Sequence, residues 1–74
     1  MRIRYFTQTD TALLEFSSDD VAVTETREIG ENVYLDLDQV GNPISMTVEH
    51  ASQVAGFPQI SVSEYRSPAS HRAE

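Results

Sequence analysis

The chain of 74 residues contains no cysteine and no lysine. Without cysteine it can form no disulfide framework, no thiolate zinc site and no cysteine nucleophile, so packing alone must stabilise the fold. No run of about 18 apolar residues occurs, and the opening Met-Arg-Ile-Arg-Tyr-Phe lacks the apolar stretch of a signal peptide. These absences argue against a membrane-spanning helix and lead us to expect a cytoplasmic protein.

Positive charge is also scarce. Lys and Arg number 5 against 12 Asp and Glu, which gives a formal net charge of −7 with neutral histidines. Residues 15–49 hold nine of these carboxylates and only Arg27 as a basic side chain, so the middle of the chain is strongly acidic. Binding to nucleic acid or to an anionic membrane is disfavoured, because both depend on contacts from Lys and Arg. The acidity either keeps a small domain soluble or attracts a basic protein partner.

Alternation of apolar and polar residues dominates the chain. It predicts half-buried β-strands separated by turns rich in Ser, Asp, Gly and Pro. The predicted extended segments are 2–6, 11–16, 21–30, 32–38, 44–48 and 59–65. The clearest pair is the hairpin formed by 32–38 and 44–48, whose turn is predicted to need a positive φ at Gly41 and backbone hydrogen bonds to Asp38.

The period of the pattern changes after residue 48. Apolar residues recur at spacings of three and four from Val48 to Ala55, which is typical of a helix. Glu49 suits the first turn of such a helix, and Gly56 followed by Pro58 would end it. The sequence therefore predicts one short helix of about two turns.

Together these patterns predict an α+β fold that is mostly β, in a chain too short for more than one domain. We expect a small antiparallel β-meander sheet of about five to six short strands, with one short helix near residues 49–56. Residues 1–66 would form the domain, with strand 59–65 at an edge of the sheet, and residues 67–74 a disordered C-terminal tail. The predicted core is Ile3, Tyr5, Ala12, Leu14, Phe16, Val23, Ile29, Val33, Leu35, Leu37, Ile44, Met46, Val48, Ala51, Val54 and Phe57.

A series of short motifs resembles a known family. In chain order they are Ile3-Arg4-Tyr5, Asp10, Ala12-Leu13-Leu14, Val33-Tyr34-Leu35-Asp36-Leu37-Asp38, Gly41-Asn42-Pro43-Ile44 and Val48-Glu49-His50-Ala51-Ser52. They resemble the bacterial small-protein family catalogued as domain of unknown function 2283, over about residues 1–54. The resemblance implies a compact β-meander closed by a short helix, with no established activity. Some members lie beside small toxin-like genes, which implies an antitoxin-like, partner-binding role.

The chain differs from the family pattern in two places. Phe6 stands where members usually carry Asp, and residues 57–65 run past the usual end of the family domain. Both differences bear on how this particular chain would assemble.

Four side chains are candidates for binding a metal or small ligand: Asp36, Asp38, Glu49 and His50. Asp36 and Asp38, with Gly41 at the sixth position, match the start of an EF-hand calcium loop. Val40 at the fifth position offers no side-chain oxygen, and Thr47 at the twelfth offers no bidentate carboxylate. A hairpin turn is therefore favoured over a metal site.

We assign neither a metal nor a cofactor to this sequence. His50 has no second histidine in the predicted domain, because His71 lies in the tail. No serine stands in a Gly-x-Ser-x-Gly nucleophile turn, and the three glycines are too far apart for a phosphate loop. With no catalytic constellation visible, we expect a protein that is not an enzyme.

The residues between the predicted core positions suggest a contact surface. Phe6, Leu13 and Tyr34 fall by parity on the outward face of their strands, where a solvated sheet carries polar groups. Either a partner covers them or the terminal segment from residue 57 onward folds across them. The side chains that share this parity and should form cross-strand ion pairs are Arg2, Arg4, Glu15 and Asp36.

The function that agrees best with these features is that of a non-catalytic protein-interaction module. Its surface would combine the outward residues Phe6, Leu13 and Tyr34 with Ile60 and Val62 of the terminal strand, whose free backbone groups could pair with a second copy. We expect a homodimer or an even-numbered oligomer, and a small basic protein as a further possible partner. The alternative is a small-ligand or metal-binding domain that uses the acidic cluster.

Overall fold

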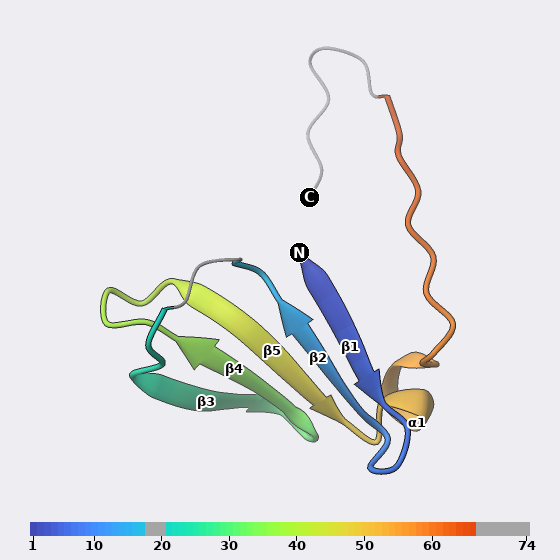
Figure 1. Ribbon diagram of the computed structural model, residues 1–74, viewed down its shortest axis with the longest axis horizontal. Helices are drawn as coiled ribbons and strands as arrows, with labels where there is room; N and C mark the ends of the chain where they lie inside the picture. The colour runs from blue at the N-terminus through green and yellow to red at the C-terminus, as the bar shows by residue number, and fades with distance from the viewer. Residues whose placement is uncertain (18–20, 67–74) are drawn as a thin grey trace.

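The computed structural model describes residues 1–17 and 21–66 (Figure 1). Five strands form a single antiparallel sheet, and one short helix follows the last strand. The elements are β1 (Arg2–Phe6), β2 (Thr11–Glu15), β3 (Glu25–Gly30), β4 (Val33–Leu37), β5 (Pro43–Glu49) and α1 (Ala51–Ala55). The predicted fold class is confirmed. No helix in this described part is long and apolar enough to cross a membrane.

The strands lie in the order β1-β2-β5-β4-β3. This order departs from that of a strict meander at one connection, because the chain leaves β2 and reaches the far edge of the sheet as β3. Two hairpins then bring β4 and β5 back, so that β5 pairs with β2 in the middle of the sheet. The longest strand is thus central, and β1 and β3 are the two edges (Figure 1).

The strand register sorts the side chains onto two faces. One row across the sheet consists of Ile3, Leu14, Met46 and Leu35, and the next row of Tyr5, Ala12, Val48 and Val33. Because strand side chains alternate with a period of two, these rows share one face, which we call the apolar face. The residues between them form the opposite, polar face.

The core lies at one end of the apolar face. Ala12, Val48, Ala51 and Phe57 form the buried cluster. The partly buried side chains packed against it are Ile3, Tyr5, Leu14 and Met46. The ring of Phe57 stacks on that of Tyr5 with centroids 5.8 Å apart. Helix α1 lies at the same end, and among residues 1–17 and 21–66 no helix lies over β3 and β4 (Figure 1).

Four predicted core residues are exposed instead, so this part of the prediction is wrong. Phe16, Val23, Ile29 and Val54 are 38%, 49%, 52% and 47% accessible. Ile29 lies in β3, where all six residues are exposed, and Val54 lies in α1, which buries only Ala51. Phe16 follows the end of β2, and Val23 precedes the start of β3. Among the described residues no large side chain is completely buried.

The limits of three elements also differ from the prediction. The strand expected over 21–30 begins only at residue 25, where pairing with β4 starts. Residues 58–66 form neither strand nor helix and are exposed throughout, because they pair with no neighbouring strand, so the strand predicted over 59–65 is wrong. The tail expected over 67–74 lies outside the described residues.

Helix α1 is shorter than predicted because β5 extends through Glu49 and His50 adopts a left-handed φ of 54°. Gly56, with φ 75°, ends the helix as expected.

The turn between β4 and β5 agrees with the prediction. Gly41 has a φ of +89°. The Asp38 carboxylate accepts the backbone N–H groups of Val40 and Asn42 at 3.0 and 2.8 Å. Gly41 therefore supplies the backbone conformation and Asp38 the hydrogen bonds that reverse the chain.

Substitution of Gly41 tests this turn. We expect Gly41→Ala to lower the free energy of unfolding by about 1–2 kcal/mol, because a Cβ disfavours positive φ. Gly30→Ala is the matched control, since neither glycine has an atom within 4 Å of an added Cβ and only Gly41 of the two has a positive φ. Equal losses at both positions in urea titrations would contradict this account.

Candidate functional site

The apolar face is unevenly covered: α1 and Phe57 pack over one end, and Leu37 is buried at the other, with 5% of its surface accessible. Beyond the core, Phe16 continues the ladder with a hydrogen bond from its N–H to the Ile44 carbonyl at 2.9 Å, which places both side chains beside Leu14 and Met46. Ile44, Met46 and Leu14 are half-buried, and Phe16 is exposed. A single layer of sheet thus presents a band of apolar side chains that the described part of the chain leaves open.

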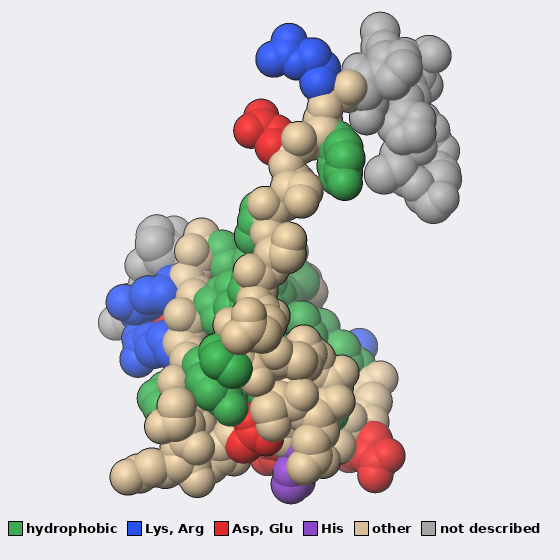
Figure 2. Space-filling view, turned by 90° about the vertical axis from the view of Figure 1, so that its right-hand side faces the viewer, with side chains coloured by type: hydrophobic (Ala, Val, Ile, Leu, Met, Phe, Trp, Pro, Cys, Tyr) green, Lys and Arg blue, Asp and Glu red, His purple; other side chains and the backbone are tan. Residues whose placement is uncertain are grey.

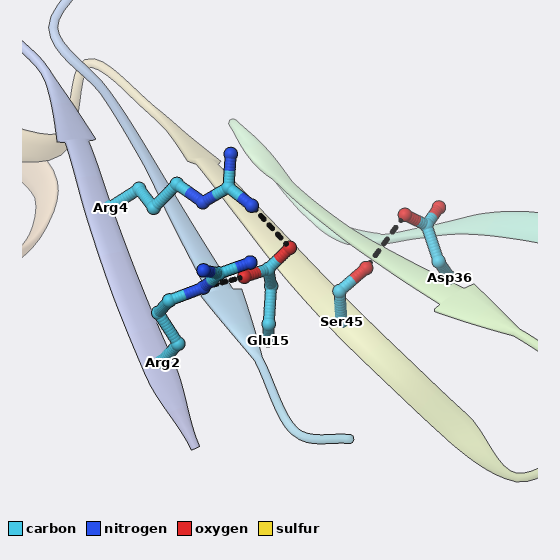
Figure 3. Close-up of polar contacts among 5 residues, drawn as sticks. All are labelled: Arg2, Arg4, Glu15, Asp36 and Ser45. Atoms are coloured by element: carbon cyan, nitrogen blue, oxygen red, sulfur yellow. Dashed lines mark hydrogen bonds and ion pairs between the residues drawn. The ribbon is translucent and has the colours of Figure 1, made fainter. Parts of the chain in front are cut away.

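The polar face carries two groups of bonded side chains, one centred on Glu15 and the other on Asp36; Figure 3 shows the contacts of Glu15 with Arg2 and Arg4 and that of Asp36 with Ser45. The Glu15 carboxylate on β2 forms ion pairs with Arg2 Nε at 2.7 Å and with Arg4 Nη2 at 3.3 Å. Asp36 on β4 accepts hydrogen bonds from Ser45 Oγ at 2.9 Å and from Thr26 Oγ1 at 2.6 Å. The expected ion pairs form at Glu15, whereas Asp36 binds hydroxyl groups.

These contacts satisfy both carboxylates from within the sheet. The Arg2 guanidinium, with Arg4 beside it, holds the pKa of Glu15 below its usual value. Ser45 is buried, and its hydroxyl donates to Asp36. Because each carboxylate already has its partners, Glu15 joins β1 to β2 and Asp36 joins β4 to β3 and β5, and neither is a free ligand site.

The three outward apolar residues lie on two neighbouring rows of the polar face. Leu13 and Tyr34 both stand beside Thr47, and Phe6 stands at the sheet edge opposite Thr11. Phe6 is 46% accessible, whereas Leu13 and Tyr34 are half-buried. The register therefore brings Leu13 and Tyr34 to either side of one residue and leaves Phe6 separate.

Tyr34 lies among acidic groups. Glu28 is its direct cross-strand neighbour, and Glu49 follows two residues after its other neighbour, Thr47. The charge of Glu49, followed by that of Glu28 and by burial, raises the pKa of the Tyr34 hydroxyl. This end of the polar face is consequently both aromatic and anionic.

The four ligand candidates do not converge. Asp36 is held by hydroxyl groups on the polar face, Asp38 by the backbone of the turn, Glu49 ends β5, and His50 is exposed. Within the described ranges no three His, Asp or Glu side chains gather as a metal would require. The remaining two predicted site residues, Ile60 and Val62, lie in segment 58–66 and are 51% and 90% accessible.

The structure also assembles a polar junction that sequence reasoning did not single out as a site. The Asp10 carboxylate accepts hydrogen bonds from the Tyr5 hydroxyl at 2.6 Å, from the Ser52 N–H at 2.9 Å and from the Ser52 hydroxyl at 2.7 Å. The Asp10 carbonyl accepts the Ala51 N–H at 2.8 Å. A residue of the β1–β2 turn therefore caps the start of α1.

One signal in the sequence could have revealed this junction. The N-cap of α1 is His50, which makes no side-chain capping bond, and the N-cap position favours Ser, Thr, Asp or Asn. A helix with a poor local cap needs acceptors from elsewhere in the chain. Asp10, at φ 54°, presents both its carbonyl and its carboxylate to the helix.

Comparison with known proteins assigns the chain to a family. A family model described as "Protein of unknown function (DUF2283)" matches residues 2–52, which is most of the chain. The protein belongs to this family. No curated protein and no solved structure gave a significant match. The matched region ends at Ser52, so it contains the whole Asp10 junction and excludes segment 58–66.

Acid should weaken the Asp10 junction. The hydrogen bonds from Tyr5 and then Ser52 lower the pKa of Asp10 from 3.8. The folded chain then binds fewer protons at this site than the unfolded chain, so the stabilisation is complete above pH 3.8 and is lost as pH falls through the lower folded pKa. We expect Asp10→Asn to reduce the dependence of unfolding free energy on pH below about 4.

Urea titrations at pH 7, 4 and 3 on both proteins measure this difference. Tyr5→Phe should reduce the same pH dependence in part, because it removes the donor that contributes most to lowering the pKa of Asp10 and keeps the aromatic ring. An identical pH slope in the Asp10→Asn and unsubstituted proteins would contradict the assigned role.

Metal ions should leave the folded state unchanged. A specific site would raise the melting midpoint at micromolar metal by mass action. We expect no shift with calcium, magnesium, manganese or zinc, because the candidate carboxylates are dispersed. A rise that disappears in Asp38→Asn or Glu49→Gln would instead support the ligand-binding alternative.

Proposed function

We propose that this protein is a non-catalytic interaction module that acts by self-association through the apolar face of its sheet. One observation carries the proposal: α1 and Phe57 pack over one end of that face, whereas Leu14, Ile44 and Met46 are only half-buried and Phe16 is 38% accessible. Exposed apolar area of this kind favours association, since burying it gains about 25 cal/mol per Å².

The size of the face supports an interface. Its apolar residues lie on β1, β2, β5 and β4, because on β3 the charged Arg27 and Glu25 stand on this face and form an ion pair. Strands about 4.8 Å apart and about 3.4 Å per residue give these four short strands a face on the order of 300 Å². Contiguous apolar patches beyond a few hundred Å² mark binding sites on soluble proteins. A stable dimer buries about 800 Å² on each partner, so the sheet face needs a contribution from a further part of the chain.

A basic protein is the second partner that the surface favours. Glu28, Glu31 and Glu49 form no ion pair within the described part of the chain, and two of them flank Tyr34. An antitoxin-like role would use this acidic surface to bind a small cationic partner. Such binding would weaken as salt screens the charges.

Sedimentation tests the self-association. We expect a dimer at micromolar concentration, and a monomer for Phe16→Asp, because the variant places a charge on the exposed apolar face. Val40→Asp is the matched control: Val40 is 73% accessible but lies in the β4–β5 turn. Circular dichroism should show both variants folded.

Two results would contradict the proposal. One is a monomeric full-length protein across this concentration range. The other is a Phe16→Asp variant that dimerises as strongly as the unsubstituted chain.

A further inference from the structure

The two edges of the sheet differ in how they are protected against pairing. The β3 edge carries Glu25 and Glu28, and a register shift lies between Glu28 and Gly30. Edge carboxylates and bulges oppose the addition of a further strand. The β1 edge has neither device in the described structure.

The charged residues of β1 do not shield its edge. Arg2 and Arg4 reach inward over β2 to Glu15, as Figure 3 shows. Their side chains therefore lie over the sheet, and the backbone N–H and C=O groups on the outer side of β1 have no strand beside them. Free backbone groups in a row are a template for another extended chain.

Segment 58–66 has the properties of such a chain. It follows the anchored Phe57, and after the bond from the Gln59 N–H to the Gly56 carbonyl it makes no further backbone hydrogen bond in the described structure. Figures 1 and 2 show it extended and standing clear of the domain. Its apolar Ile60 and Val62 alternate with polar residues, the pattern of a strand with one buried side.

We propose that residues 59–65 of one copy add as an antiparallel strand to the free edge of β1 in a second copy. The inference rests on the proposed self-association and names the part of the chain that completes it. The second copy is the favoured acceptor because the segment projects away from its own sheet, with Val62 90% accessible, and because the apolar face alone is smaller than a dimer interface requires.

Parity restricts the register of this pairing to steps of two residues, because Ile60 and Val62 must continue the apolar face. We choose the register that places both of them beside apolar residues of β1, namely Tyr5 and Ile3 of the second copy. In the same register Ser61 stands beside Arg4. The added strand thus extends the apolar rows at the edge where Phe57 already stacks on Tyr5.

Single cysteines introduced into this cysteine-free chain test the pairing. Arg4→Cys in one preparation and Ser61→Cys in another place one thiol on each partner of the proposed pair, at two exposed positions. Directly opposed strand residues have Cβ atoms about 4.5–5.5 Å apart, close to disulfide reach. We expect mild oxidation of the mixture to give a covalent dimer containing one chain of each kind.

The matched control replaces Ser61→Cys with Val62→Cys. That thiol lies one residue away and on the opposite face, so we expect the mixed dimer to form at least several-fold less. Equal yields from the two mixtures would overturn the proposed register. Tagging one chain so that it differs in mass separates mixed dimers from those of identical chains.

A chain that carries both Arg4→Cys and Ser61→Cys distinguishes pairing between two copies from pairing of the segment with β1 of its own chain. A disulfide within one chain, with no mixed dimer from the single variants, would overturn the exchange between copies. Sedimentation of the full-length protein distinguishes the failure of the strand addition from the failure of the self-association. A dimer that does not form this cross-link overturns the strand addition alone. A monomer overturns the self-association as well.

Discussion

The arrangement of sheet and helix depends on the hydrogen bonds that the Asp10 carboxylate accepts. This carboxylate lies in the turn between the first two strands and accepts hydrogen bonds from Tyr5 and from Ser52, which is 42 residues after Asp10. Helix α1 has only five residues and no side-chain cap of its own, and a helix so short is unstable in isolation. By fixing the first turn of α1, Asp10 also positions Phe57 against Tyr5, and so determines which end of the apolar face the helix covers.

The region that the family model matches contains the residues of the Asp10 junction. The family model ends at Ser52, and the motif residues Tyr5, Asp10 and Ser52 meet around one carboxylate. Their shared role is to hold the β1–β2 turn to the helix. The features that we propose for assembly are of another kind: they are a partly uncovered sheet face, an unguarded strand edge and a segment that follows the matched region.

The sequence predicted the local strands and turns better than the burial and the neighbours of individual side chains. The hairpin of β4 and β5 was predictable because alternation and the turn at Gly41 specify the same register. Phe16 was predicted on the correct face of the sheet, but it is exposed and not buried. Alternation tells which face a side chain joins, and it does not tell whether another layer covers that face. The same limit applies to Ile60 and Val62, since alternation predicts an extended backbone without identifying its neighbour. Asp10 was not predicted as a site because Ser52, the residue of α1 that it caps, is 42 residues away in sequence.

The non-consecutive place of β5 has a consequence for how the chain folds. Strands β1 and β2 form one local hairpin, while β3, β4 and β5 form a second unit of adjacent strands. Each unit closes short loops at small entropic cost, whereas the pairing of β2 with β5 must close the long stretch between them. This topology predicts that the docking of the two units is slower than the formation of either one. The bonds from Ser52 to Asp10 join a residue that follows the second unit to the turn of the first, so the junction stabilises the docked arrangement of the two units.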